Sequence, residues 1–441
     1  MIIRSDVKQL LDSIAIIPGG RAYLVGGFVR DSLLGLPSHD YDIVTNIGIN
    51  ELKRHLDSHG YVAINTNDFG TLAVILNGQK IDIAQFRADT YDMVGRKPSI
   101  QPVSTIEEDL NRRDFSINSM AYEYPSMKLI DPFKGAEDLK RKILRSIRNP
   151  NLVFMEDPLR MMRAARFAAK YSLTVSPDLS EAMLAKKYEL RRISAERIRE
   201  ELFKGFSLSP SERGQYAANL IDFHLLEIII PEFSQINNIR HDSRGHHYDE
   251  LLAQHMVDSV SHYRGQDALV AITIFLHDIG KIQAYKQVDG KAMFLDHDTI
   301  GAQILAGRLP QLKFTRQETG FIVNAVKNHL FFSQLKQSTP SNQYKKLAKM
   351  FIEQNENIDF LIKLAEIGQA DQAADYTEYV RILRSFTSMP KIVTGNDVLA
   401  LPPLYRAKAL RKARYYQLIH QGETSEQLLH LVRNDFREGI L

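Results

Sequence analysis

The chain of 441 residues contains no cysteine, which excludes disulfide bonds, thiolate metal ligands and a cysteine nucleophile. Long hydrophobic runs are also lacking: residues 269–276 and the interrupted run 225–233 are far shorter than the roughly 20 residues that cross a bilayer. Neither sign of charge dominates, with 56 Lys and Arg against 53 Asp and Glu, so a nucleic-acid partner would have to bind local basic patches. Charged residues at positions 4, 6 and 8 interrupt any secretion signal. We expect a cytoplasmic protein without a membrane segment.

The pattern of apolar residues divides the chain into an α/β head and a helical remainder. After about residue 138, apolar residues recur every three or four positions and strand signals almost vanish. Breaks in the pattern near residues 239–247 and 388–395 predict further boundaries. Strands are expected at residues 22–25, 41–44, 71–76, 81–86 and 128–130, with helices near 6–14, 28–34 and 49–58. The expected domains are residues 1–138, 139–238, 239–388 and 389–441.

A strand, a glycine pair and a helix start follow one another in Tyr23-Leu-Val-Gly-Gly-Phe-Val-Arg-Asp31. Glycines such as Gly27 let backbone N–H groups approach a phosphate closely, and a helix N-terminus adds partial positive charge. Arg30, on the first turn, could hold the same anion with two hydrogen bonds. A tight structural turn would explain the glycines equally well.

Two aspartates follow in Asp40-Tyr-Asp42. Residues two apart in an extended segment point to the same side, so both carboxylates converge. The two carboxylates repel each other unless a cation lies between them, and hard oxygen ligands suit Mg²⁺. With the upstream glycines, the pair predicts phosphoryl transfer. The alternative is a polar strand edge with two solvated aspartates; Asp82, on a later strand, is not assigned to the site.

A strongly patterned helix opens at Glu156-Asp-Pro-Leu-Arg160. Asp157 and Pro158 are residue types that begin helices, which would be enough to explain both. Asp157 and Arg160 also share one face, where an acceptor and a forked donor could hydrogen-bond a base edge. Residues 134–170 hold ten Lys and Arg against four Asp and Glu, which suits either RNA phosphates or a solvated helical face.

A second set of candidate ligands lies in the helical half. Imidazole and carboxylate groups together suit Mn²⁺, Fe²⁺, Ni²⁺, Zn²⁺ or Mg²⁺ at an open hydrolytic centre. A lone histidine is usually a packed or solvated residue without a special role. The adjacent pair His277-Asp278, which lies between apolar residues, is harder to explain in that way. The candidate ligands are His255, His277, Asp278, His297, His329 and Asp371.

The head motifs resemble those of class II tRNA nucleotidyltransferases, the CCA-adding enzymes and their bacterial poly(A) polymerase relatives. Further motifs follow in the family's order, so the resemblance covers about residues 20–206. They are Glu108-Asp-Leu-Asn-Arg-Arg-Asp-Phe-Ser-Ile-Asn-Ser119, Asp131-Pro-Phe-Lys-Gly135, Glu156-Asp-Pro-Leu-Arg160 and Ser194-Ala-Glu-Arg-Ile-Arg199. The later order of histidines and aspartates resembles the HD phosphohydrolase superfamily, where His297 and His329 match the extra histidines of two-metal members.

The resemblance implies a nucleotidyltransferase head with a mixed sheet and helices, an all-α neck, an HD domain and a helical tail. It implies template-independent addition of CCA to tRNA from CTP and ATP, with Asp40 and Asp42 holding catalytic Mg²⁺. Arg113 would contact the triphosphate or ribose. Asp157 and Arg160 would select the base. The implied nucleotide-binding set is Gly27, Arg30, Arg113, Asp157, Arg160, Arg163 and Arg166.

Several questions stay open at this point. The HD domain could act as a phosphohydrolase with Ni²⁺, Mn²⁺ or Mg²⁺. Addition of only CC or only A is an alternative, and in the family this choice is attributed to a loop, here about residues 88–104. Poly(A) polymerase activity is another alternative, although Asn67-Asp-Phe-Gly-Thr-Leu-Ala-Val74 resembles the corresponding strand entry of CCA-adding enzymes. An HD phosphohydrolase with a nucleotide-binding head is the alternative of another class. The oligomeric state is not predicted. A basic helix at residues 404–414 is expected to meet the tRNA elbow.

Overall fold

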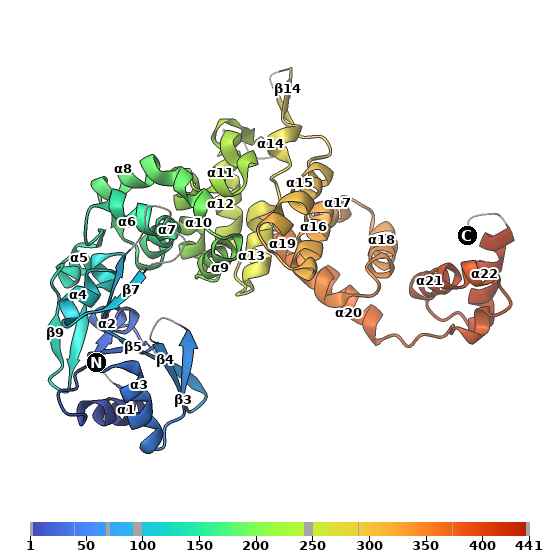
Figure 1. Ribbon diagram of the computed structural model, residues 1–441. Coiled ribbons are helices and arrows are strands. Elements are labelled where there is room, and N and C mark those ends of the chain that lie inside the picture. The colour runs from blue at the N-terminus through green and yellow to red at the C-terminus, as the bar shows by residue number, and fades with distance from the viewer. Residues whose placement is uncertain are drawn as a thin grey trace. The chain divides into compact units, whose positions relative to one another are not determined.

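The computed structural model describes residues 3–38, 40–67, 71–90, 99–241, 250–289, 291–372 and 374–437. Figure 1 follows the chain from the sheet-containing head to the helical C-terminal part. The chain divides into two compact units. The first comprises Met1–Glu201 and Asn219–Pro231, and the second Leu202–Ala218 and Glu232–Leu441.

The first unit contains a seven-stranded mixed sheet in the order β3-β4-β5-β2-β1-β8-β9. β2 and β5 pair in parallel, whereas the other neighbours in this order are antiparallel. This confirms the expected α/β head. The strands are β1 (Ala22–Val25), β2 (Asp42–Thr45), β3 (Ala63–Asn67), β4 (Thr71–Leu76), β5 (Gln79–Gln85), β8 (Ala121–Tyr124) and β9 (Lys128–Ile130). A separate hairpin joins β6 (Arg87–Thr90) and β7 (Ser99–Pro102).

Alternation along the strands gives the sheet two apolar faces. Leu24 and Ile43 pack on one face against α1 (Ser5–Ala15) and α3 (Ile49–Ser58). Tyr23 and Val44 point to the other face, which packs against α4 (Ile106–Leu110). The short helix α2 (Gly27–Leu33) leaves the end of β1 directly. The ends of β1 and the start of β2 therefore lie side by side, at the residues that the sequence singles out.

The remainder of the first unit is helical, apart from the small parallel pair β10 (Ile143–Leu144) and β11 (Thr174–Val175). Helix α7 is amphipathic, and its buried residues include Met161, Met162, Ala164 and Ala165. The helices are α5 (Gly135–Arg141), α6 (Pro150–Glu156), α7 (Leu159–Tyr171), α8 (Pro177–Lys186), α9 (Ala195–Phe206), α10 (Pro210–Asp222) and α11 (Leu226–Ile229). Helix α9 runs from the first unit into the second, and α10 runs from the second unit back into the first.

The second unit is also mostly helical. Its central helix, α13, is apolar on all sides and buried from Val270 to Leu276, so it needs neighbours all round. The helices are α12 (Leu252–His262), α13 (Ala268–Leu276), α14 (Lys281–Ala284), α15 (His297–Gln311), α16 (Arg316–Asn328), α17 (Phe331–Lys336), α18 (Pro340–Glu353), α19 (Ile358–Gln372), α20 (Thr377–Ser388), α21 (Pro403–Ile419) and α22 (Ser425–Arg437). Two short pairs, β12 (Arg240–His241) with β13 (Glu250–Leu251) and β14 (Lys286–Val288) with β15 (Lys291–Met293), interrupt them.

Some sequence expectations fall on residues outside the described ranges. These are most of the expected linker at 239–247, part of the loop at 88–104 and residues 68–70 of the expected strand entry. Among the described residues, no helix is both long and apolar enough to cross a membrane.

Candidate functional site

Three carboxylates meet around the first residue of β2. Asp42 pairs in register with Val25 of β1 and with Asp82 of the parallel strand β5. Burial raises the pKa of Asp42 to about 6, with Asp40 and Asp82 adding to the rise and Arg113 opposing it. The negative charge around Asp42 is therefore not fully compensated by the protein, and carboxylate oxygens are the ligands that a hard divalent cation prefers. The donor set fits such an ion.

Asp82 is an addition to the site expected from the sequence. It reaches Asp42 because β2 and β5 run in parallel, a pairing that joins residues 40 positions apart. Its own countercharge is Lys80, whose Nζ lies 2.7 Å from Asp82 Oδ1. The sequence did place Asp82 on a strand. It could not show that this strand lies next to the strand of Asp42, because strand order depends on the tertiary fold.

The glycine pair brings the backbone close to this site. Gly26 has a φ of 66°, and a Cβ at this residue would lie 3.1 Å from Arg113 Nη1 and 3.5 Å from Asp42 Oδ2. A side chain at this residue is therefore disfavoured by the left-handed backbone conformation, and its Cβ would also crowd the Arg113 guanidinium. Gly27 has more room, since its Cβ would meet only Arg30 Nη2 at 3.5 Å. The structure thus brings Arg113 close to the Asp42 carboxylate.

Arg30 lies in a different setting from the one expected. Its side chain is buried, pairs with Asp31 at 2.9 Å and donates to Asn118. The guanidinium carbon lies 4.4 Å from the ring centroid of Tyr171. The hydrogen bonds of Arg30 are therefore directed at residues within the fold.

Asp157 and Arg160 lie at the junction of α6 and α7. Asp157 Oδ1 accepts a hydrogen bond from the backbone N–H of Leu159 at 3.2 Å, so this carboxylate does help to start α7. Asp157 Oδ2 accepts from Arg197 Nη2 at 2.7 Å. Arg160 is buried and donates to Glu156 Oε2 at 3.0 Å and to the carbonyl of Arg112 at 2.8 Å. Both side chains of the expected base-reading pair are held in place.

The cationic face of α7 is largely paired with acids. Arg163 lies 2.6 Å from Asp114 Oδ2, and Arg166 lies 2.5 Å from Glu201 Oε1. Burial acts to raise the pKa of Asp114, but Arg163, Asn118 and Arg160 outweigh burial and bring it to about 2. Six of the ten basic residues in 134–170 form ion pairs, so the local charge excess is smaller at the surface than in the sequence.

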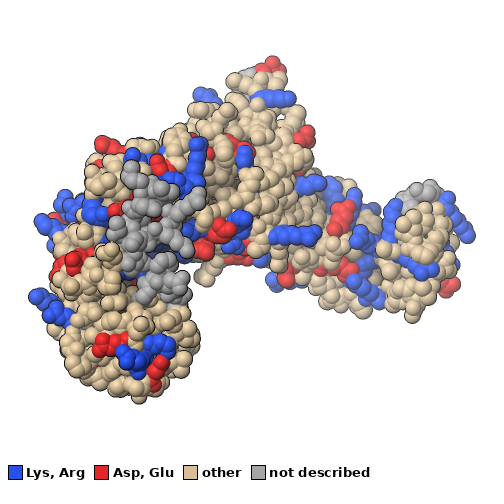
Figure 2. All heavy atoms as spheres, in the orientation of Figure 1, with Lys and Arg blue, Asp and Glu red and all other residues tan. Residues whose placement is uncertain are grey.

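The basic C-terminal helix forms as expected within α21, and Figure 2 shows Lys and Arg side chains on the surface of the C-terminal part. Arg414 is an exception. It is buried and donates to the carbonyls of Phe386 at 2.9 Å and Met389 at 3.0 Å. This arginine stabilises the start of the tail and is not offered to a partner.

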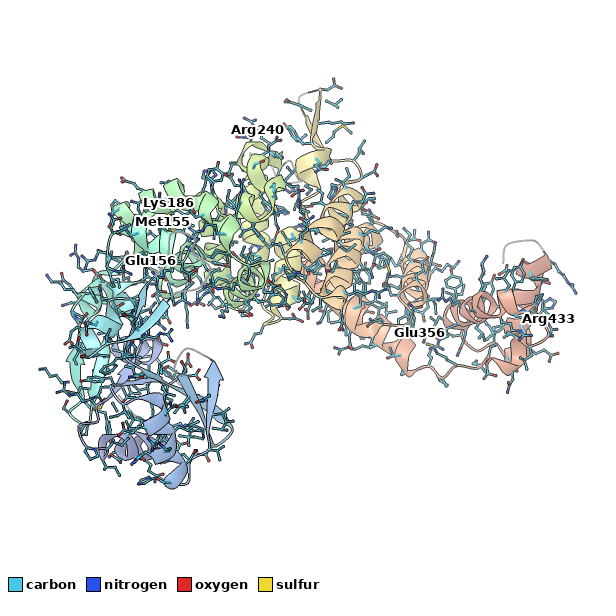
Figure 3. The ribbon with its side chains drawn as sticks, viewed as in Figure 1. Met155, Glu156, Lys186, Arg240, Glu356 and Arg433 are labelled. Carbon is cyan, nitrogen blue, oxygen red and sulfur yellow. The ribbon has the colours of Figure 1, made fainter. Side chains whose placement is uncertain are left out.

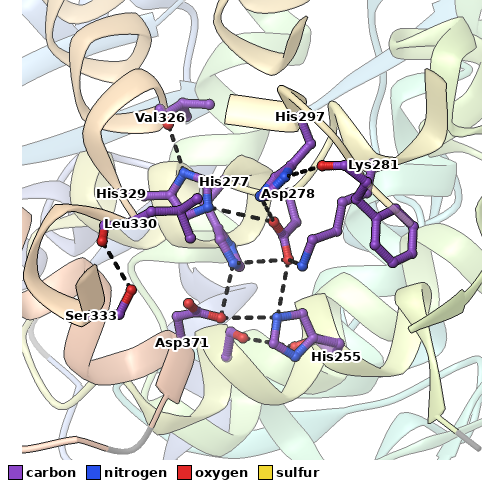
Figure 4. Close-up of polar contacts among 12 residues, drawn as sticks. His255, His277, Asp278, Lys281, His297, Val326, His329, Leu330, Ser333 and Asp371 are labelled. Atoms are coloured by element: carbon purple, nitrogen blue, oxygen red, sulfur yellow. Dashed lines mark hydrogen bonds and ion pairs between the residues drawn. The ribbon is translucent and has the colours of Figure 1, made fainter. Parts of the chain in front are cut away.

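The histidines and aspartates of the second unit form one cluster (Figure 4). One ligand atom each from His255, His277, Asp278 and Asp371 lies within 4.8 Å of the others, and the same holds for Asp278, His297 and His329. Asp278 belongs to both groups. The residues come from α12, the end of α13, α15, the end of α16 and α19, so the structure brings together every histidine and aspartate expected at this site.

Backbone carbonyls orient the three buried rings. The Nδ1 atoms of His277, His297 and His329 lie 2.6, 2.8 and 2.7 Å from carbonyl oxygens three residues earlier, so each ring is oriented with Nε2 toward Asp278 or Asp371. Such second contacts fix the tautomer of a metal-binding histidine. His297 Nε2 lies 3.4 Å from Asp278 Oδ1, yet neither atom has a hydrogen bond of good geometry among the described residues. The donor set fits a divalent cation between these atoms.

The charges of the cluster agree with that fit. Burial lowers the pKa of His277, but Asp278 and Asp371 more than offset burial and raise it to about 10. A proton on His277 thus supplies positive charge that a divalent cation could supply instead.

Two further residues join the cluster. Lys281 Nζ lies 2.5 Å from Asp278 Oδ2 and 3.3 Å from His241 Nδ1, and the His241 ring stacks on His255 at 3.9 Å. His241 falls in the stretch expected to be a linker, so its place was not foreseen. Lys281 follows Asp278 by three residues, a helical spacing that could have indicated it.

Comparison with known proteins identifies the parts. Residues 22–145 match the poly A polymerase head domain, residues 172–236 a probable RNA and SrmB-binding site of polymerase A, and residues 250–365 the HD domain. A multifunctional CCA protein of Xanthomonas oryzae pv. oryzae is 30% identical over 318 residues, which are 70% of this chain and 75% of that protein. The chain belongs to the CCA-adding enzyme family. The Xylella fastidiosa multifunctional CCA protein is 34% identical over 269 residues, 59% of this chain and 62% of that protein.

The fold agrees with this family over the whole chain. A crystal structure of the Bacillus stearothermophilus CCA-adding enzyme in complex with CTP aligns with a TM-score of 0.73 at 22% identity, covering 100% of both chains. Among curated family members, the chain covers less than two thirds of the Xylella protein's own length. Family and fold are therefore established.

Proposed function

We propose that this protein adds the 3′-terminal CCA to tRNA, with CTP and ATP as substrates and without a nucleic-acid template. The observation that carries the proposal is the convergence of Asp40, Asp42 and Asp82 beside Arg113 and the glycine turn at Gly26. Relatives of this chain are named multifunctional CCA protein and CCA-adding enzyme, and the structure of the Bacillus stearothermophilus CCA-adding enzyme, which has the same fold, is a complex with CTP. A cytoplasmic location forms part of the proposal, because tRNA and nucleoside triphosphates are found there.

Asp40 and Asp42 are the proposed ligands of Mg²⁺, with Asp82 as their close neighbour. When bound, Mg²⁺ would activate a hydroxyl and neutralise the triphosphate. In the proposed reaction the tRNA 3′-hydroxyl attacks the α-phosphate and pyrophosphate leaves. Arg113 lies beside Asp42 and is proposed to hold the triphosphate or ribose. The backbone at Gly26 can come close to the phosphates because no side chain intervenes.

Base choice is proposed to rest on Asp157 and Arg160. Cytosine and adenine both present an amino donor beside a ring-nitrogen acceptor, whereas uracil and guanine present a carbonyl beside an N–H. A carboxylate and a guanidinium side by side match the first pattern and oppose the second. Arg163 and Arg166 are already paired with Asp114 and Glu201. To bind the nucleotide directly, each arginine would have to contact it while also contacting its carboxylate. Arg30, by its contacts, is proposed to support the glycine turn from within.

The HD cluster is proposed as a second metal centre, holding Ni²⁺, Mn²⁺ or Mg²⁺, with phosphohydrolase activity. Its support is the convergence of ring nitrogens and carboxylate oxygens, of which His255 Nε2, Asp278 Oδ1 and His297 Nε2 have no hydrogen bond of good geometry among the described residues. Hydrolysis of 2′,3′-cyclic nucleotides with each metal in turn tests this activity.

One experiment separates the candidate activities of the head. Three tRNA transcripts, lacking CCA, CA or only the final A, are incubated with CTP and ATP singly and together. Full restoration of all three supports CCA addition, whereas growth on only some transcripts indicates a CC-adding or A-adding enzyme. Long A tails from ATP alone would indicate a poly(A) polymerase, and no growth at all would favour the HD alternative.

The base-reading pair is tested separately with UTP and GTP. Asp157→Ala and Arg160→Ala should each weaken selection of CTP and ATP by about 1–3 kcal/mol, since each leaves a polar partner unsatisfied. If both variants keep normal selection, Asp157 serves only to start α7.

A further inference from the structure

Asp157 is held by a residue outside its own helix. It follows α6 directly, with an extended backbone (φ −142°, ψ 96°), and Glu156, labelled in Figure 3, is the last residue of α6. One carboxylate oxygen of Asp157 accepts a hydrogen bond from the backbone N–H of Leu159, which is only two residues away. The other accepts from Arg197 of α9, 40 residues later, at 2.7 Å. Among the hydrogen bonds between described residues, only the bond to Arg197 ties the Asp157 carboxylate to another element.

Helix α9 contacts the segment around α7 at two places. Arg197 and Glu201 are four residues apart and therefore lie on one face of α9. Arg197 binds Asp157 just before α7, and Glu201 accepts from Arg166 Nε at 2.5 Å two turns into α7. The Glu201 side chain is buried, so this second contact anchors the helices and leaves the first to act on Asp157.

We propose that Arg197 is a positioning residue for base selection, because it fixes the orientation of the Asp157 carboxylate. This inference rests on the proposed role of Asp157 in reading the base. Each carboxylate oxygen can accept two hydrogen bonds, so Asp157 can keep Leu159 and Arg197 and still accept from an amino group. Without Arg197 the carboxylate can turn about its side-chain bonds. Its direction then no longer opposes the carbonyl of uracil or guanine.

The expected effect is moderate, because the Arg197 side chain is 48% exposed and that of Asp157 19% exposed. Arg197→Met keeps the apolar length of the side chain and removes the charged donor. It should raise the ratio of kcat/KM for UTP to that for CTP about threefold to tenfold. Arg197→Lys should restore part of the selectivity, because an ammonium can donate one bond to the same oxygen.

The test uses the full chain and the tRNA transcript that lacks CCA. kcat and KM are measured for CTP and UTP with the wild type, Arg197→Met, Arg197→Lys, Asp157→Ala and the double variant Asp157→Ala with Arg197→Met. ATP and GTP are compared in the same way on the transcript that lacks the final A. Arg191→Met is the matched control, because Arg191 stacks on Tyr188 in the preceding segment and does not contact Asp157. Circular dichroism checks that each variant folds.

The proposal expects lower selectivity in Arg197→Met, normal selectivity in Arg191→Met, and no additional loss when Arg197→Met is combined with Asp157→Ala. Normal selectivity in Arg197→Met, with a loss in Asp157→Ala, overturns the role of Arg197 alone. An equal fall of kcat/KM for every nucleotide also overturns it, since that result indicates a structural role. Normal selectivity in Asp157→Ala overturns the base-reading role of Asp157 and this inference with it.

Discussion

Replacing Asp42 by Asn should stabilise the protein while removing its proposed metal site. The carboxylate of Asp42 is ionised at neutral pH against burial and against Asp40 and Asp82, and its pKa of about 6 lies above the ordinary value of 3.8. Ionising it at pH 7.5 therefore costs about 3 kcal/mol of folding free energy, an upper figure because Arg113 and solvent can adapt. Asp42→Asn removes that cost and leaves the shape of the side chain nearly unchanged.

The sign of the pH dependence follows from proton binding. Because the folded protein holds the Asp42 proton more tightly than the unfolded chain does, the destabilisation grows as pH rises from about 4 to about 6 and is fully present above that range. The advantage of Asp42→Asn should therefore be largest at pH 7.5 and about half as large at pH 5.

The assay is urea unfolding at both pH values in EDTA, followed by circular dichroism because the chain has no tryptophan. Asp57→Asn is the matched control, since Asp57 lies in the same unit on α3 with its exposed carboxylate 2.6 Å from Lys53, and its removal should bring no gain. Adding Mg²⁺ should stabilise the wild type and leave Asp42→Asn unchanged. A variant no more stable than the wild type at pH 7.5 in EDTA would refute the reasoning that burial and the neighbouring carboxylates make an ionised Asp42 costly to the fold.

Three further predictions concern the two sites. Asp40→Ala should lower nucleotide addition at least ~100-fold without unfolding the head, measured by incorporation of labelled CTP; near-normal addition would remove Asp40 from the proposed metal site. His277→Ala combined with Asp278→Ala should abolish Mn²⁺ uptake in dialysis followed by metal analysis and spare most CCA addition; joint loss in a folded variant would show that the two activities are coupled. Gly280→Ala should destabilise the second unit and weaken metal uptake, because its Cβ would lie 1.9 Å from a backbone oxygen of α15. Gly307→Ala, within α15 and with open space around it, should do neither, and equal effects of the two substitutions would refute the packing argument.

The sequence by itself determined the features that depend on neighbouring residues. The strand, turn and helix around Gly26 were predictable, because a run of apolar residues, a glycine pair and a helical pattern follow one another directly. The spacing in Asp40-Tyr-Asp42 likewise indicated a cation site, since backbone geometry alone relates residues two apart. The resemblance to a family added expected roles for residues such as Arg113, which lies near Asp42 in the fold.

Only the tertiary structure decided which distant residues became partners. Asp82 joined Asp42 through parallel strand pairing, and the arginines of α7 proved to be paired with Asp114 and Glu201 instead of forming an open cationic face. His241 reached the HD cluster from an expected linker. These contacts depend on how apolar faces pack and which strands share hydrogen bonds, and both are settled by burial over the whole fold. Local patterns show which side chains can carry charge, but the packed fold decides which charges neutralise one another.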